Sequence, residues 1–187
     1  MIPIKNKKKS LEVTVDEMRN FSFNYIEKYA PSKQQLKTYL LKKYLTKFQG
    51  SRQRKEVTEI IDNIVSNLEK SHFLNDSLYS DSKARTLFRR GYSLNKIGNS
   101  LRYKGIEQKK IQASLEKIRS EKTDPDFTSA MKICKKRRIG PMRPEGNREI
   151  FYKKDMGILA RGGFSFDLSK RVLNLDLDEF NKLLKIV

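Results

Sequence analysis

A seven-residue motif that occurs twice constrains the fold of this chain more than any other feature. Leu87–Ser93 and Leu159–Ser165 share the pattern Leu-x-Arg-x-Gly-aromatic-Ser at a constant offset of 72 residues. The pattern predicts a helix that ends at glycine, an aromatic side chain that anchors the corner, and a serine that caps the next helix. Repetition at a fixed spacing is typical of stacked helical units. The alternative is that such corners are generic to helical proteins.

A weaker match extends the repetition toward the N-terminus. The spacing of apolar residues that begins at Ser32 recurs 61 residues later from Ser93, with Pro31 in place of the corner aromatic. The match predicts that an earlier unit begins its second helix at Ser32. The corner residues that we predict are Ser32, Gly91, Tyr92, Ser93, Gly105, Gly163, Phe164 and Ser165.

Helical periodicity dominates the rest of the sequence, and no segment has the alternation of a strand. Capping boxes are predicted at Thr14 and Ser32, and apolar residues at i, i+3, i+4 spacing follow each of them. The sequence predicts ten helices, among them 53–70, 127–138 and 147–161. Glycines and prolines between the last two ranges predict a mobile loop.

The repeats and the helices together predict an all-α fold of three tandem three-helix units. We expect an N-terminal basic segment and the first repeat over 1–72 and the second repeat over 73–123. A basic helix and the third repeat are expected over 124–187. Each unit is too small to bury its own faces, so neighbouring units must stack into an elongated, curved body. Such a body offers one long surface to a filament or a polynucleotide.

The net charge of +19 is spread along the chain rather than held in a tail. The three expected units carry +7, +7 and +5. This distribution indicates an extended basic surface, which is the electrostatic footprint of a nucleic-acid or nucleoprotein partner. The alternative is that the basicity serves only solubility.

Little in the sequence suggests catalysis, a cofactor or a metal. The single Cys134 and the lone His72 exclude a disulfide framework and a multi-histidine metal site, and no phosphate-binding loop is present. Lysines near Cys134 could lower the pKa of its thiol, but we expect a structural role. Asp176 and Asp178 could bind Mg²⁺ for phosphodiester cleavage, although helix capping explains them better. We therefore expect no enzymatic activity.

The sequence also has no feature of a membrane or secreted protein. No apolar run approaches the roughly 20 residues that span a bilayer. The N-terminal lysines are not followed by the apolar stretch of a signal peptide. We expect a cytoplasmic protein that works as a monomer.

Dense runs of cations near predicted helix ends are the candidate contacts with an anionic partner. Five cations lie within 132–138, and Arg143 and Arg148 follow them. Arg102-Tyr103-Lys104 places an aromatic ring between two cations, which suits phosphate contact with base stacking or packing. For Tyr92 and Phe164 we expect corner packing. The candidate contact residues are Lys43, Arg89, Arg90, Arg102, Lys104, Lys132, Lys135, Lys136, Arg137, Arg138 and Arg161.

At these residues the sequence resembles the RecX family of regulators of the bacterial RecA recombinase. Phe73–Asp76 resembles the family's aromatic-Leu-Asp-Asp helix entry, and Arg89–Ser93 its Gly-Tyr/Phe corner. Leu101–Ile106 resembles the family's helix ending in Leu-x-x-Lys-Gly-Ile, and Leu159–Ser165 its Leu-x-Arg-Arg-Gly-Phe-Ser signature. The resemblance spans about residues 15–175.

The resemblance implies a tandem three-helix-repeat protein in the helical groove of the RecA–ATP–single-stranded DNA filament. Such a protein would limit filament extension, RecA ATPase, strand exchange and the co-protease role of RecA in the SOS response. Its partners would be the RecA filament and single- or double-stranded DNA, the DNA being bound weakly without RecA. The residues alone leave an alternative open, namely a free-standing helical module that binds DNA or RNA without RecA.

Overall fold

The computed structural model describes residues 14–46 and 51–186, and over these ranges it contains helices and no strands. The all-α prediction is confirmed. The expected basic segment before Thr14 and the expected break at Gly50 lie outside the described residues. The α-helices are α1 Val15–Tyr29, α2 Lys33–Leu45, α3 Ser51–Lys70, α4 Asp76–Arg89, α5 Leu94–Tyr103, α6 Gln108–Glu121, α7 Pro125–Arg137, α8 Glu145–Arg161, α9 Phe166–Leu173 and α10 Leu177–Ile186.

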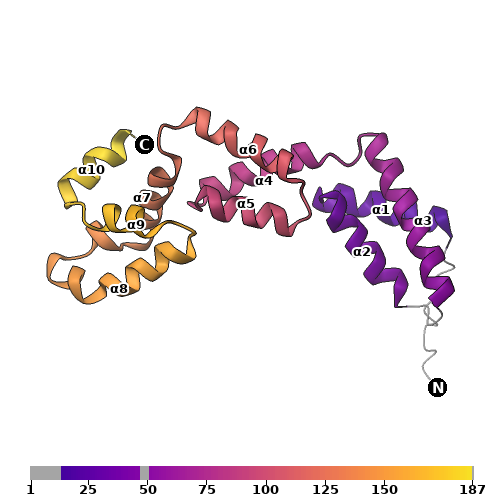
Figure 1. Ribbon diagram of the computed structural model, residues 1–187, viewed down its shortest axis with the longest axis horizontal. Coiled ribbons are helices and arrows are strands. Elements are labelled where there is room, and N and C mark those ends of the chain that lie inside the picture. The colour runs from indigo at the N-terminus through magenta and orange to yellow at the C-terminus, as the bar shows by residue number, and fades with distance from the viewer. Residues whose placement is uncertain (1–13, 47–50, 187) are drawn as a thin grey trace, which may run out of the picture. The chain divides into compact units, whose positions relative to one another are not determined.

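The first compact unit of the chain ends at Asn75 and contains α1, α2 and α3 (Figure 1). Left-handed Ala30 and Pro31 separate α1 from α2, because proline cannot continue a helix. The predicted capping box is present at the start of α2. The Ser32 hydroxyl accepts a hydrogen bond from the backbone amide of Gln35, and the side-chain oxygen of Gln35 accepts one from the backbone amide of Ser32. The fully buried core residues are Met18, Leu36, Leu40, Tyr44 and Ile61.

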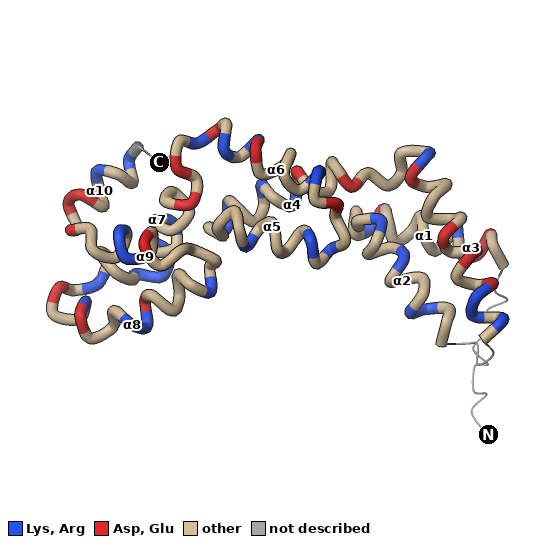
Figure 2. The backbone as a smooth tube through the Cα atoms, viewed as in Figure 1, with Lys and Arg blue, Asp and Glu red and all other residues tan. Residues whose placement is uncertain are grey.

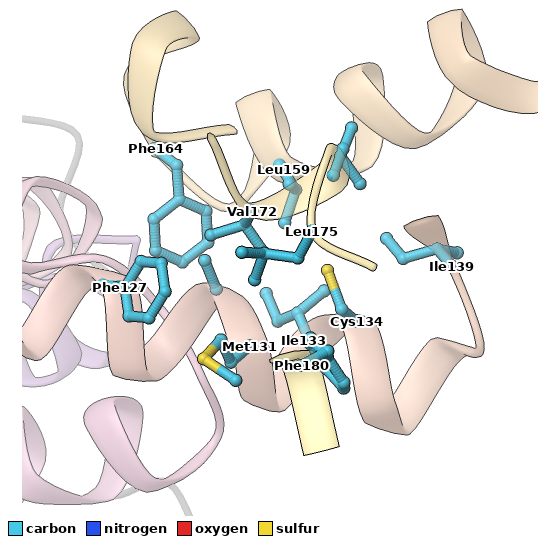
Figure 3. Close-up of a cluster of buried hydrophobic side chains, with 12 residues drawn as sticks. Phe127, Met131, Ile133, Cys134, Ile139, Leu159, Phe164, Val172, Leu175 and Phe180 are labelled. Carbon is cyan, nitrogen blue, oxygen red and sulfur yellow. The ribbon is translucent and has the colours of Figure 1, made fainter. Parts of the chain in front are cut away.

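The second compact unit begins at Asp76 and contains two hydrophobic cores. α4, α5 and α6 surround one of them, to which Ile97 and Leu101 contribute fully buried side chains. α7 to α10 surround the other, in which Met131 of α7 clusters with Val172 of α9 (Figure 3). The first unit has a core of its own. The predicted fold of tandem three-helix repeats is thus confirmed, and the last core takes in four helices, α7 to α10.

The segment between α7 and α8 differs from the mobile loop that its glycines and prolines predict. Gly140–Met142 forms a 3₁₀ turn, and Gly140 is buried. The carboxylate of Asp155, only 1% exposed, accepts bonds from the Gly140 amide (2.9 Å) and from Arg143 (2.6 and 2.7 Å). This contact lies 15 residues away in the sequence, so the local composition of the segment does not reveal it.

Within the described ranges, no helix is both long and apolar enough to cross a lipid bilayer.

Candidate nucleic-acid interface

Four helices of the second unit, α4, α5, α7 and α8, end in the same backbone geometry, which we call a corner. Each corner has one left-handed residue, and the amide after it donates to the carbonyl five residues back, as in the Schellman motif. The left-handed residues and their φ angles are Gly91 (88°), Gly105 (76°), Arg138 (52°) and Gly163 (86°). The closing bonds run from Tyr92 to Leu87 (3.2 Å), Ile106 to Leu101 (3.2 Å), Ile139 to Cys134 (3.1 Å) and Phe164 to Leu159 (3.3 Å).

The corner at Arg138 is not predicted by the sequence. A left-handed backbone usually selects glycine, because a Cβ atom crowds the following carbonyl. The other three corners have glycine there, and their positions are visible in the sequence for that reason. Arg138 closes its corner without one, and the only sequence signal is the run of cations before a buried Ile139.

A buried residue precedes each corner, and a buried or partly buried residue follows it, while cations and Tyr103 between them reach the solvent. Leu101 and Ile106, for example, are 0% and 4% exposed. Two residues before the left-handed position the chain has Arg89, Tyr103, Lys136 and Arg161, and all four are exposed. One residue before it the chain has Arg90, Lys104, Arg137 and Gly162. The candidate cations therefore gather at these corners because the fold projects those positions into solvent.

Cations at a helix C-terminus also stabilise the helix itself. Unpaired carbonyls give that end a partial negative charge, and a Lys or Arg there contributes about 0.3–1 kcal/mol. This local role explains why the sequence places cations at the ends of α4, α7 and α8. The interaction with the helix end does not prevent these cations from binding an external anion, because their side chains remain exposed to solvent.

The corners of α4 and α8 contact each other directly. The Ser93 amide donates to the Gly162 carbonyl at 3.2 Å, and Lys96 Nζ donates to the Arg161 carbonyl at 2.5 Å. A Cβ atom on Gly163 would lie 2.5 Å from Ser93 Oγ, which is too close for any side chain. The contact brings the Arg90 end of α4 next to the α8 corner.

α7 packs against the corner of α4. A Cβ atom on Gly91 would lie 3.1 Å from the Ile133 side chain, and Lys132 Nζ lies 5.3 Å from the centre of the Phe88 ring. Burial and the neighbouring Lys122 lower the pKa of Lys132. Lys136 follows Lys132 by one turn, so both lie along the same side of α7. Figure 2 shows the cations of both units distributed along the helices rather than at one end.

Two candidate cations have structural partners outside this group. Lys43 lies on α2 in the first unit, with its Nζ 3.2 Å from the centre of the Phe21 ring. Arg102 lies at the end of α5 and donates to the amide oxygens of Asn99 (2.6 Å) and Gln108 (3.1 Å).

The two arginines that follow the basic run of α7 are occupied within the fold. Arg143 is held by the carboxylate of Asp155, and Arg148 donates to the carbonyls of Leu173 and Leu175. Both side chains therefore brace the fold, and we do not count them among the candidate contact residues. Lys135, by contrast, is exposed in the last turn of α7.

Cys134 and Asp176, the candidate residues for catalysis, have structural roles in the fold. Cys134 is fully buried, and burial raises the pKa of its thiol to about 12. The Asp176 carboxylate accepts a bond from the Glu179 amide (2.6 Å) and thereby caps α10, as predicted. Among the described residues, no group of three or more His, Cys, Asp or Glu side chains is arranged to hold a metal ion.

Fold and site together define a class: basic, all-helical proteins of tandem three-helix repeats whose exposed cations lie at helix ends. No family model matches the sequence. The chain is 32% identical to the regulatory protein RecX of Myxococcus xanthus, covering 89% of each chain. It is 24% identical to the regulatory protein RecX of Agrobacterium fabrum, covering 89% of this chain and 86% of that one.

A solved structure has the same fold. The crystal structure of a regulatory protein RecX superposes with a TM-score of 0.60 at 21% identity, covering 86% of this chain and 72% of that one. The chain belongs to the RecX family of regulatory proteins.

Proposed function

We propose that this protein is a non-enzymatic regulator that binds the RecA–single-stranded DNA filament and mostly inhibits it. The activities affected would be the recombinase, ATPase and co-protease activities of RecA in DNA repair and the SOS response. Family membership supports a regulatory role. The proposal places the protein with its filament in the bacterial cytoplasm, bound as a monomer and without a cofactor.

The observation that carries this proposal is the grouping of cation-bearing corners around α7. Corners from α4 and α8 join through the bond between Ser93 and Gly162, and α7 packs on the first of them. Exposed cations at these corners suit the phosphates of a nucleic acid, which contribute most of its affinity for a basic protein.

The RecA ATPase assay tests the proposal directly. The protein is added to RecA, ATP and single-stranded DNA at low salt, and ATP hydrolysis is followed. Hydrolysis should decline as the protein approaches the concentration of RecA. An unchanged rate at stoichiometric protein would contradict the proposal.

Charge reversal tests the α7 corner within that assay. Replacing Lys136 and Arg137 with Glu should weaken inhibition several-fold at low salt, because both side chains project from the corner. The matched control replaces Lys109 and Lys153, which are exposed and lie outside the four corners, with Glu. An equal loss of inhibition in the two double variants would show that Lys136 and Arg137 act only through the net charge of the protein.

The second candidate is a free-standing nucleic-acid-binding module, which the same exposed cations favour. The two functions differ in whether DNA alone is bound tightly. Titrating labelled single-stranded DNA with the protein, with and without RecA, separates them. Tight binding without RecA, combined with an unchanged RecA ATPase, would support the module over the filament regulator.

A further inference from the structure

Tyr103 occupies the corner position at which the other three corners carry cations. Two residues before the left-handed residue, α4, α7 and α8 have Arg89, Lys136 and Arg161, whereas α5 has Tyr103. A cation at this position interacts favourably with the helix dipole, and a neutral phenol does not. The substitution of an aromatic residue therefore brings no benefit to the helix end.

The ring of Tyr103 has no role in the core either. It is 86% exposed and lies outside the hydrophobic cluster of α4, α5 and α6. At the aromatic positions of two other corners, by contrast, Phe164 is 7% exposed and Tyr92 is partly buried. The aromatic ring of Tyr103 therefore does not contribute to packing of the hydrophobic core.

The corner beneath Tyr103 is fixed rather than loose. Leu101 and Ile106 are buried on either side of it, and the Ile106 amide closes the turn onto the Leu101 carbonyl. Arg102 is held by the amide oxygens of Asn99 and Gln108, both neutral, so its positive charge is not cancelled by these partners.

The ring also lies among positive charges. Lys104 Nζ is 5.8 Å from its centre, and Arg102 directly precedes it. An exposed, rigidly mounted aromatic ring between two cations matches the sites on single-stranded nucleic acid proteins where a base stacks and phosphates are neutralised. No other large hydrophobic side chain of α5 or α6 is exposed, so the immediate surroundings of the ring on these two helices are polar rather than apolar.

We propose that Tyr103 is a base-stacking residue for single-stranded nucleic acid, with Arg102 and Lys104 neutralising the flanking phosphates. The inference rests on the proposed function in that a strand must be present in the partner. Duplex DNA is a poor ligand for this site, because its bases already stack on one another.

The absence of tryptophan from the chain makes the test specific. In the variant Tyr103→Trp the new indole is the only one, and stacking against a base quenches its fluorescence. The probe is a twenty-residue oligothymidylate, titrated at low salt. The matched control is Phe166→Trp, because Phe166 is 67% exposed but lies at the start of α9 beside Asp167.

Quenching of Tyr103→Trp by oligothymidylate, without quenching by an abasic oligomer of equal length or in Phe166→Trp, is the expected result. The abasic strand offers the same phosphates and no bases. Equal quenching by both strands would overturn the proposal, as would binding seen by oligomer anisotropy without any quenching. A complete lack of binding at low salt would overturn it as well.

Affinity provides a second readout. Tyr103→Ala should weaken oligothymidylate binding by about 5- to 150-fold, the range of losses that removal of one base–aromatic contact produces, while Tyr103→Phe should retain it. Tyr103→Arg, which copies the α4 corner, should bind the abasic strand at least as well and lose the preference for bases. Equal affinities of Tyr103→Ala and the parent would overturn the proposal.

These outcomes are separable from the fate of the proposed function. The parent protein in the RecA ATPase assay tests the regulator, and the fluorescence and affinity measurements test only the ring. Because Tyr103 is exposed, its variants should unfold at the same urea concentration as the parent, and that measurement excludes misfolding as a cause.

Discussion

Individual side chains fix the path of the backbone at points where the local sequence is ambiguous. The carboxylate of Asp155 is the clearest case, since it gathers a backbone amide and a guanidinium from the turn between α7 and α8. A segment rich in glycine and proline is thereby held in one conformation. Sequence patterns reveal helix caps and apolar faces, but they do not reveal that an acceptor 15 residues away binds the Gly140 amide.

Removing the Asp155 carboxylate should therefore be costly. Asp155→Ala leaves Arg143 partly buried without its partner and the Gly140 amide without its acceptor, so we expect a loss of about 3–5 kcal/mol in the free energy of unfolding. Urea unfolding followed by circular dichroism measures it. Arg148→Ala removes part-buried bonds to two carbonyls but leaves no buried carboxylate or charge without its partner, so it serves for comparison and should cost less. A loss below about 1 kcal/mol for Asp155→Ala would show that the turn between α7 and α8 is stable without the Asp155 carboxylate.

At the scale of elements, the corner is the unit from which the second half of the chain is built. The motif in the sequence identifies the two corners at Gly91 and Gly163, and Gly105 marks a third. The corner at Arg138 is not visible in the sequence, because an arginine rather than a glycine has the left-handed backbone there. Helix existence and most helix ends follow from caps and prolines, which act locally.

Glycine at the α8 corner should be the less replaceable of the two motif glycines. In Gly163→Ala the methyl group would lie 2.5 Å from Ser93 Oγ and 2.8 Å from Lys96 Cβ, whereas in Gly91→Ala the nearest atom is at 3.1 Å. Both variants also strain a positive φ, at about 1–2 kcal/mol. We expect Gly163→Ala to lose more unfolding free energy than Gly91→Ala, as measured by urea denaturation. The reverse order would show that the contact between the corners yields easily.

The junction between α5 and α7 should respond to pH through Asp126. Its carboxylate accepts a bond from the Leu94 amide at 2.7 Å, and burial raises its pKa above the ordinary value. The folded state therefore holds this proton more tightly than the unfolded chain, and stability falls as pH rises through the interval above the ordinary value.

Asp126→Asn removes that dependence and keeps an acceptor for the Leu94 amide. We expect the variant to gain stability relative to the parent as pH rises from 4 to 7, measured as the difference between their urea unfolding free energies. Asp126→Ala, which leaves the amide without an acceptor, should be less stable than both at neutral pH. A difference between Asn and Asp that does not change with pH would contradict the argument.

At the scale of the whole molecule, the excess of positive charge favours an anionic partner, and the corners are the places of contact that we propose. The partition of +19 among the repeats follows from the sequence alone, as does the all-helical class. The choice of candidate contact residues does not, because Arg143 and Arg148 are as basic as Lys136 in sequence but bond to groups within the folded chain. Exposure and internal partners distinguish the candidate contact cations from cations that brace the fold, and both are properties of the folded chain.

Salt dependence should report the corner cations as a group. On single strands the logarithm of the binding constant falls with the logarithm of salt concentration by about 0.7 per phosphate neutralised. Replacing Arg89, Lys136 and Arg161 together with Gln should reduce the magnitude of that slope by about 2 units. Fluorescence anisotropy of a labelled oligonucleotide at several salt concentrations measures both slopes. Parallel lines for the variant and the parent would show that these side chains make no phosphate contact.

The joint between the α4 and α8 corners has a consequence for how such a chain tolerates change. Its hydrogen bond connects a main-chain amide to a main-chain carbonyl, at Ser93 and Gly162, so neither partner is a side chain that substitution could remove. This main-chain bond therefore depends on the length of the segment between the two corners rather than on the identity of the side chains at Ser93 and Gly162. Exchanging Lys96 would remove the side-chain bond to the Arg161 carbonyl and leave the main-chain bond in place, whereas inserting one residue between Gly91 and Ser93 would shift the Ser93 amide out of reach of its acceptor.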